Sequence, residues 1–519
     1  MFVPSAAAKR LVVGLHLERT AFPVACLIVM AWVASGFGHS LRPAGPTSVP
    51  TISADFANRN NRTRRIPAGG FGINLAALQD RTILTDLTQA GITENRKMAA
   101  IPEVYATTTP DWRAFDSNMK LEKSVGLHPL IVLAYSPPWL QPTQGPCAGV
   151  PTVPPTDIAQ WAQITASYVA HLDQAFPGLV HDYEIWNEPE LQKSFCVPDG
   201  QNATRLAVYL SIYAAAASAM RAQAAVDGVK IRIGGPAIAV LSLAPQWIPA
   251  LLSNSGTAPN VDFVSYHMYI TGLRQLQQGM DWNKLYSVTQ SSTKGELFYH
   301  LNIESLVRHG QQHDPWSTPI YLTEFNDNWV PQLDCCRNDP SFAPLWNTVY
   351  VSNLLNSIYV GAKHVPARVY YFAGSAGPFC IAGTWDTAMD CDPKSLQPYP
   401  QFYAFQLLAA SGYLGLSAGG YMAASVAPGS TQSGLMATAF YTSAKDAIVV
   451  VNPTNTAYPS VQVTANHSGI ANAVGTQFLL NQANPQITSQ SLPLTQISGG
   501  YTATISVPAY SIVAITIAP

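Results

Sequence analysis

The segment Tyr183–Glu190 reads YEIWNEPE and places acidic residues around an Asn-Glu-Pro turn directly after a hydrophobic run. The run, Asp182–Trp186, has the length and composition of a buried strand. Glu188 stands in the turn and is therefore predicted to lie at the carboxyl end of that strand. Glu184 lies inside the strand, and Glu190 follows the proline, where we expect a solvated helix start. Both are weaker candidates for chemistry.

Seven further apolar segments flank this strand, and helical periodicity fills the intervals between them. Ile158, Trp161, Thr165, Tyr168 and Leu172, for example, fall on one helix face behind a predicted Asp157 cap. Eight strands that alternate with helices are typical of an α/β protein with a (β/α)8 barrel, which we place at residues 70–412. The seven segments are Gly70–Leu75, Glu94–Ile101, Pro129–Ala134, Lys230–Gly235, Val261–Tyr266, Ile320–Glu324 and Arg368–Phe372.

The pattern changes after the barrel. Residues 419–519 contain short β-rich runs separated by turns and show no helical period, which predicts an antiparallel β-sandwich. Residues 37–69 are interpreted as a linker with one or more strands, within Thr51–Ile66, that join the sandwich.

The N-terminus indicates export. Positively charged residues precede the apolar run Ala21–Ala34 and the small residues that follow it, so residues 1–36 are predicted to be a signal peptide. The alternative is an uncleaved membrane anchor, although a run of 14 residues is short for a bilayer span of about 20. Either way, a secreted or periplasmic protein is expected.

The cysteines fit an exported protein. Six of the seven lie beyond the signal, and an even number favours disulfides. Sequence leaves the pairing open: Cys147–Cys196 and Cys380–Cys391 are possible pairs, with the adjacent Cys335 and Cys336 as a vicinal pair or free thiols. No histidine lies near these cysteines at zinc-ligand spacing.

Composition excludes several classes of function. With 28 Lys+Arg against 30 Asp+Glu and no basic block, nothing favours nucleic acid as a partner. There is no glycine-rich phosphate loop, and the 11 histidines are scattered, so no metal or cofactor is expected. Apart from the N-terminal segment, no run is long and apolar enough for a membrane. Oligomeric state is left open.

Two predicted strands end in a glutamate. Glu188 ends the fourth strand, and Glu324, in TEFN, ends the seventh. Both would face the barrel mouth, where active sites of this fold lie. A single glutamate at a strand end is more often a salt-bridge or capping residue, but two carboxyls at one mouth are what glycosidic bond cleavage requires.

The motifs YEIWNEPE, RIGGPA, VDFVSYHMY and PIYLTEFN, in this order, resemble the clan of (β/α)8 retaining glycoside hydrolases. The likeness is greatest to glycoside hydrolase family 39, the β-xylosidases and α-L-iduronidases. It covers most of residues 70–412 and implies an oligosaccharide or polysaccharide substrate. Carried over, it implies Glu188 as the acid/base, Glu324 as the nucleophile, and Asn187 as a contact to the sugar 2-hydroxyl.

The resemblance also implies further substrate contacts. His267 and Tyr269 match positions near the nucleophile, with Tyr269 as a donor to Glu324, and Arg96 matches an active-site arginine whose alternative is an ordinary barrel arginine. Aromatic residues near the mouth, Trp329 and Tyr371 among them, are candidates for stacking on sugars. Relatives often carry a histidine where this chain has Met98, and a tryptophan on the eighth strand where it has Tyr371 and Phe372, which leaves the sugar open.

These residues predict a mechanism. Burial and the charge of Glu324 are expected to raise the pKa of Glu188, and a carboxyl separation of about 5–5.5 Å would give double displacement with retention. The specific hypothesis is β-xylosidase-like exo cleavage. An endo-acting polysaccharide hydrolase is the alternative within the clan. The alternative of another class is a non-catalytic carbohydrate-binding protein, against which the presence of both glutamates argues.

Overall fold

The computed structural model of the chain describes residues 49–57, 65–74, 81–269, 303–307, 318–326, 366–372, 400–423, 425–428, 435–452, 456–481, 483 and 486–519. Every described residue belongs to one compact unit, residues 49–519. No helix within these ranges combines the length and apolarity that a bilayer span needs. The predicted export signal lies outside them.

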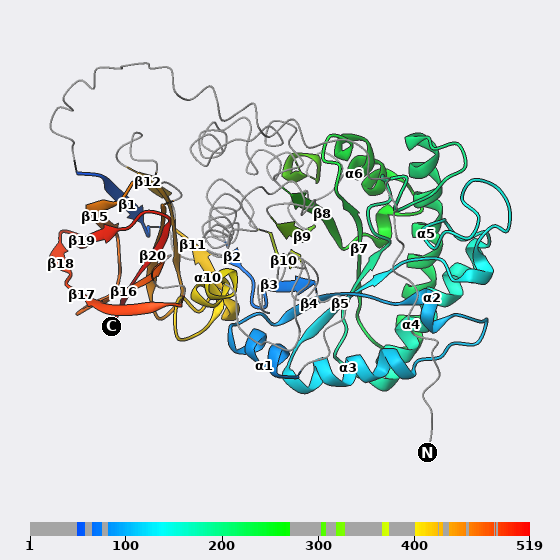
Figure 1. The fold of residues 1–519 in the computed structure, drawn as a ribbon, viewed down its shortest axis with the longest axis horizontal. Coiled ribbons are helices and arrows are strands. Elements are labelled where there is room, and N and C mark those ends of the chain that lie inside the picture. Colours follow the sequence, from blue (N-terminus) through cyan, green and yellow to red (C-terminus); the bar gives the residue numbers. More distant parts are fainter. Residues whose placement is uncertain are drawn as a thin grey trace, which may run out of the picture. The chain divides into compact units, whose positions relative to one another are not determined.

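Eight parallel strands close into a barrel, in the order β10-β3-β4-β5-β6-β7-β8-β9. Each strand pairs with its sequence neighbour, and β10 pairs with β3 to complete the closure (Figure 1). The predicted α/β fold class is therefore confirmed. The strands are β3 (Phe71–Asn74), β4 (Glu94–Met98), β5 (His128–Leu133), β6 (Asp182–Ile185), β7 (Arg232–Ile238), β8 (Phe263–Tyr269), β9 (Ile320–Asn326) and β10 (Arg368–Phe372).

Helices follow the strands and cover the outside of the barrel (Figure 1). They are α1 (Arg81–Gln89), α2 (Ile101–Val104), α3 (Arg113–Val125), α4 (Ile158–Ala175), α5 (Asn202–Asp227), α6 (Ala244–Ser253) and α10 (Pro400–Ala409). The predicted cap of α4 is confirmed: Asp157 accepts hydrogen bonds from the amides of Ala159 and Gln160. Trp161 and Tyr168 are buried as expected, whereas Ile158, at the first turn, is 38% exposed.

Two further sheets form the C-terminal domain. Their orders are β12-β1-β15-β19-β18 and β17-β16-β20-β14-β13-β11-β2, so strands from before the barrel lie in both. All pairs are antiparallel except β1 with β15, which departs from the antiparallel expectation. The strands are β1 (Thr51–Asp55), β2 (Arg65–Ile66), β11 (Gly420–Met422), β12 (Ser425–Pro428), β13 (Met436–Tyr441), β14 (Asp446–Asn452), β15 (Tyr458–Asn466), β16 (Val474–Asn481), β17 (Thr488–Leu492), β18 (Thr495–Ile497), β19 (Gly500–Val507) and β20 (Ser511–Ala518).

The barrel core continues into the seven-stranded sheet. Phe478, Leu480 and Ile512 of this sheet belong to the same buried cluster as the barrel residues. The ring of Tyr413, after α10, meets that of Phe478 edge to face, with centroids 5.4 Å apart. The other face of the sheet packs on the five-stranded sheet in a second core. The sandwich therefore shares apolar surface with the barrel.

Charged side chains gather at the amino ends of the barrel strands, opposite the mouth. Glu94, Asp182, Arg232 and Arg368 stand at the first positions of β4, β6, β7 and β10. Arg232 Nη2 donates to Asp182 Oδ2 at 2.7 Å, whereas Arg368 Nε lies 3.7 Å from Glu94 Oε2. Burial therefore prevails over the Arg368 charge and raises the pKa of Glu94 to about 8.

This shift predicts a pH-dependent stability. The pKa of Glu94 is about 8 in the folded state against an ordinary 4.5, so between these pH values the folded state binds a proton that the unfolded state does not. The contribution of Glu94 to the free energy of unfolding therefore falls as pH rises through this window and is constant above it. The free energy of unfolding should fall by at most about 1.4 kcal/mol per pH unit from this group. Urea unfolding from pH 5 to 9 should show Glu94→Gln becoming progressively more stable relative to wild type. A difference that does not vary with pH would contradict the prediction, and the exposed Glu103→Gln is the control.

One disulfide lies in the described part of the chain. Cys147, between β5 and α4, bonds Cys196, between β6 and α5, at a sequence separation of 49. It joins two loops at the carboxyl ends of neighbouring strands. The pairs considered for Cys335, Cys336, Cys380 and Cys391 lie outside the described residues.

Removal of this disulfide should destabilise the protein. Closing a 49-residue loop reduces the conformational entropy of the unfolded chain. By the loop-entropy relation, this stabilises the folded state by about 4 kcal/mol. We expect the double variant Cys147→Ser/Cys196→Ser to lose free energy of unfolding of this order in denaturant titrations. Reduction by dithiothreitol should lower the free energy of unfolding of the wild type by more than it lowers that of the double variant, and the difference should equal the loss seen in the double variant. An unaltered midpoint for the double variant would show that the disulfide does not stabilise the fold.

Candidate active site

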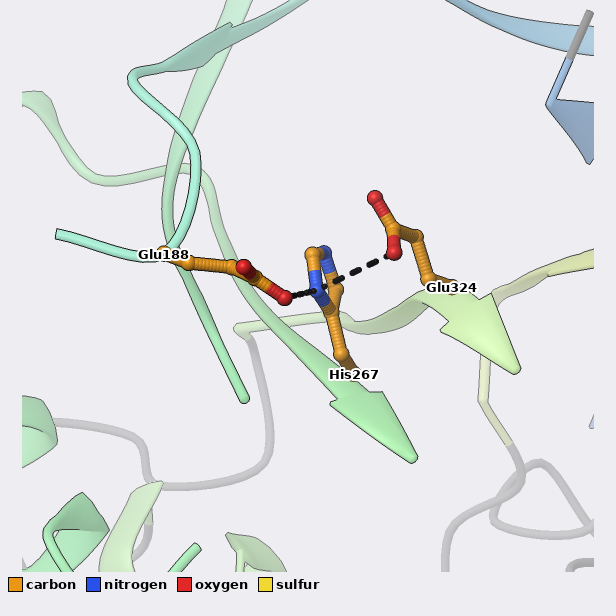
Figure 2. A group of neighbouring side chains, drawn as sticks. All are labelled: Glu188, His267 and Glu324. Atoms are coloured by element: carbon orange, nitrogen blue, oxygen red, sulfur yellow. Dashed lines mark hydrogen bonds and ion pairs between the residues drawn. The ribbon is translucent and has the colours of Figure 1, made fainter. Parts of the chain in front are cut away.

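Three side chains from three strand ends converge at the mouth. Glu188 follows β6, His267 lies in β8 and Glu324 lies in β9 (Figure 2). His267 Nδ1 is 3.0 Å from Glu188 Oε1 and 3.5 Å from Glu324 Oε2. One ligand atom from each residue lies within 4.8 Å of the other two. The structure thus brings together the two glutamates that the sequence paired.

The backbone around Glu188 adopts an uncommon conformation. Trp186 has φ 70° and Glu188 has φ 49°, both in the left-handed region that side chains with a Cβ rarely adopt. The buried Trp186 ring meets Tyr135 and Phe195, and its Nε1 donates to the Ser194 carbonyl at 2.8 Å. Packing of this ring therefore fixes a turn that aims the Glu188 carboxyl at the mouth, where such strained residues cluster in enzymes.

Arg96 connects the site. Its Nη1 donates to Glu324 Oε1 at 2.6 Å, its Nη2 to Asn187 Oδ1 at 2.6 Å, and its Nε to Glu184 Oε2 at 2.7 Å. The guanidinium is 4% exposed, and the charges of Glu184 and Glu324 outweigh burial and raise its pKa. Arg96 thus holds Glu324 and Asn187 together at the barrel mouth, and its role as an active-site arginine stays a prediction.

The arginine is itself held by residues that sequence reasoning did not select. Asn74, at the end of β3, accepts from Arg96 Nη1 at 3.2 Å and donates through Nδ2 to the Thr323 carbonyl at 3.0 Å. Glu184 is fully buried in β6. Tyr135, after β5, interacts with Asn187 and with the charges of Arg96 and both glutamates. The sequence could have indicated Asn74 by its position, because it is a polar residue at the end of a barrel strand, where active-site residues of this fold lie.

The pKa of Glu188 shifts opposite to the prediction. Burial raises it, but the hydrogen bond and charge of His267, with the charges of Lys193 and Arg96, lower it overall. For His267, burial lowers the pKa, and Glu324 and Glu188 together raise it. The imidazole therefore lies between two carboxylates that favour its charged form, a contact that the expected pairing of glutamates alone did not include.

Glu190 is not the solvated residue that the sequence suggested. It is 1% exposed, and its Oε1 accepts hydrogen bonds from the amides of Ala239 at 2.7 Å and Val240 at 2.8 Å. Burial raises its pKa to about 7. Glu190 therefore ties the turn after β6 to the loop after β7. The proline before it does not start a helix, and the chain instead turns inward.

The remaining predicted contacts have mixed outcomes. Tyr371 is fully buried and its ring packs edge to face on Phe325 and Phe405, so it contacts the outer core between β9, β10 and α10 and not a sugar. Strand alternation is the reason, because Tyr370 occupies the other face of β10. Trp329 and the side chain of Tyr269 lie outside the described part of the chain. Met98, at the end of β4, is 37% exposed.

Comparison with known proteins agrees with this fold. A β-xylosidase from Caulobacter crescentus CB15 is 16% identical, with 90% of this chain and 99% of that chain covered and a TM-score of 0.62. A GH39 enzyme from Xanthomonas axonopodis pv. citri is 15% identical, at 92% and 100% coverage and a TM-score of 0.61. A family 30 subfamily 8 xylanase from Clostridium acetobutylicum is 16% identical, at 90% and 100% coverage and a TM-score of 0.60. No curated protein matches the sequence.

The barrel with its sandwich domain is thus the fold of glycoside hydrolases, and the paired carboxyls at its mouth suit that class of enzyme. The family model of glycosyl hydrolases family 39 matches residues 102–359, a span that includes Glu188, His267 and Glu324. The chain is accordingly a glycoside hydrolase whose residues 102–359 are similar to family 39.

Proposed function

We propose that the protein is an exported retaining glycosidase that cleaves β-glycosidic bonds by double displacement, with Glu324 as nucleophile and Glu188 as acid/base. The observation that carries this proposal is the spacing of the carboxyls, which have oxygens within 4.8 Å of each other. Retaining enzymes hold the two carboxyls about 5–5.5 Å apart, whereas inverting enzymes need about 6.5–9.5 Å to admit a water. The site has room for direct attack.

The surrounding contacts support these unequal roles. Arg96 bonds one oxygen of Glu324 and leaves the other, Oε2, directed toward Glu188 and His267. Glu324 Oε2 attacks the anomeric carbon while Glu188 gives a proton to the leaving oxygen. Because His267 lowers the pKa of Glu188, the imidazole, 3.0 Å away, must first pass a proton to this carboxyl. Glu188 then removes a proton from the water that releases the sugar. Asn187, oriented by Arg96, meets the sugar 2-hydroxyl.

For the substrate we propose β-xylosides, cleaved from the chain end. Support comes from the family 39 domain and from the structural likeness to a protein described as a β-xylosidase. Internal cleavage of xylan is the second candidate, because the structural neighbours also include family 30 xylanases. Both assume the same chemistry at Glu188 and Glu324 and differ in the length of substrate that enters.

Hydrolysis of an aryl β-xyloside, followed by proton NMR, tests the reaction. Retention predicts β-xylose as the first-formed anomer, before mutarotation produces the α-anomer. Initial formation of α-xylose would refute double displacement. Release of xylose from xylo-oligosaccharides without shortening of long xylan supports exo action, and rapid shortening of long chains supports the endo alternative.

A further inference from the structure

The convergence of Glu188, His267 and Glu324 also has the features of a metal site. We propose that these three side chains bind a divalent transition ion of the Zn²⁺ type, and that the bound ion inhibits the glycosidase by occupying the place of the reacting sugar. The ligand atoms are Glu188 Oε1, His267 Nδ1 and Glu324 Oε2, shown converging in Figure 2. The inference goes beyond hydrolysis and does not depend on which sugar is cleaved.

The spacing of the ligand atoms suits zinc. A tetrahedral site with bonds of about 2.1 Å has ligand atoms about 3.4 Å apart. Nδ1 of His267 lies 3.0 Å from Glu188 Oε1 and 3.5 Å from Glu324 Oε2. The two carboxylate oxygens, at most 4.8 Å apart, must approach each other by a small side-chain rotation. One imidazole with two carboxylates is a donor set that zinc accepts, with a fourth position open to water.

The neighbouring residues orient these ligands. The second oxygen of Glu324 accepts from Arg96 at 2.6 Å, and the second oxygen of Glu188 accepts from Ser194 at 3.4 Å. Hydrogen bonds of this kind hold the coordinating oxygens in place in metal sites. When Nδ1 coordinates, the ring proton resides on Nε2, which has no partner among the described residues. This second nitrogen is buried, so Nδ1 is the nitrogen that faces the site.

The local charge also suits a dication. Glu188, Glu324 and the buried Glu184 supply three negative charges, and Arg96 supplies one positive charge. Coordination requires the neutral form of His267, so the bound ion displaces any proton on Nδ1. The group then carries a net charge of about −2, which a divalent ion neutralises. Lys193 is exposed and contributes a more distant positive charge. Glu184 is essential to this balance, because Arg96 would otherwise cancel the attraction of Glu324.

Calorimetric titration of the full chain with zinc chloride tests the site without need of substrate. We expect one ion per chain, competitive inhibition of xyloside hydrolysis, and recovery after addition of EDTA. His267→Asn and Glu188→Gln should each weaken binding at least about tenfold. His171→Asn is the matched control, since His171 pairs with Asp116 at 2.7 Å and with no second carboxylate in the described part of the chain. This variant should bind zinc as the wild type does.

Several results would overturn the proposal. These are absence of binding in the calorimeter, non-competitive inhibition, or unchanged affinity in both correctly folded ligand variants. Circular dichroism identifies any variant that fails to fold, and the other variant then decides. Co²⁺ in place of Zn²⁺ distinguishes the ligands: a thiolate charge-transfer band would assign the ion to cysteines and refute the site. If xyloside hydrolysis is absent altogether, the direct titration still decides the metal question.

Discussion

Replacement of Glu324 by alanine should reduce the hydrolysis of aryl β-xylosides by roughly 10⁴-fold or more, the scale seen when a hydrolase loses its nucleophile. Without this carboxylate no glycosyl-enzyme can form, and Arg96 is left with one fewer anionic partner, since its Nη1 bonds Glu324 at 2.6 Å. Steady-state kinetics with an activated aryl xyloside measures the loss. The drop should appear in kcat whatever the leaving group.

The configuration of the product formed with azide provides a control for Glu324→Ala. Azide can enter the space of the lost carboxylate and attack the anomeric carbon once, so the glycosyl azide formed should have the inverted, α configuration. Glu103→Ala, on the exposed side of α2, should hydrolyse as the wild type does. Activity of Glu324→Ala within tenfold of wild type would show that another group is the nucleophile.

Replacement of Glu188 by alanine should produce a loss that depends on the leaving group. General acid catalysis contributes about 10²–10⁴-fold, and this is required only where the leaving oxygen needs a proton. We therefore expect a loss of this size with xylobiose or an alkyl xyloside, and a much smaller loss in the first step with a dinitrophenyl xyloside. Comparison of kcat/KM for these substrates in the same variant provides an internal control.

Azide separates the two glutamates. In Glu188→Ala it replaces water, needs no general base, and should restore turnover of the dinitrophenyl xyloside with a β-xylosyl azide as product. The product configuration is thus opposite to that expected for Glu324→Ala. Equal losses for all leaving groups, with no azide effect, would remove Glu188 from the acid/base role and leave it as a structural residue of the turn.

The fold was predictable because its signals are local. Short apolar strands and the Asp157 cap are read from neighbouring residues. Eight repeats of strand and helix then leave few possible topologies. The parallel pairing of β1 with β15 was not predictable, because strand direction within a sandwich is determined by partners far along the chain. The same applies to Cys147–Cys196, for which sequence offered a possible pair and no more.

Site residues were predictable from the sequence where their residue type and strand position indicate chemistry. They were not predictable where the packing around them decides their role. Glu188 and Glu324 stand out at strand ends. Tyr371 was misplaced because aromatic residues on both faces of β10 read alike in the sequence. Glu190 was misjudged because its two backbone donors belong to the loop after β7. The contacts of His267 with both glutamates, and the metal site proposed from them, depend on interatomic distances that no spacing in the sequence encodes.

The sandwich has a consequence for how the protein is made. Ser53 in β1 accepts a hydrogen bond from Asn466, which lies 413 residues later, and β1 is enclosed between β12 and β15. During synthesis β1 must therefore wait for more than 400 further residues before both of its neighbours exist. Such distant pairing slows folding and leaves an uncovered strand edge exposed to association with other chains. A chaperone that binds the nascent strand, or an export route that delivers the chain unfolded, would solve a problem that the order of strands in this domain creates.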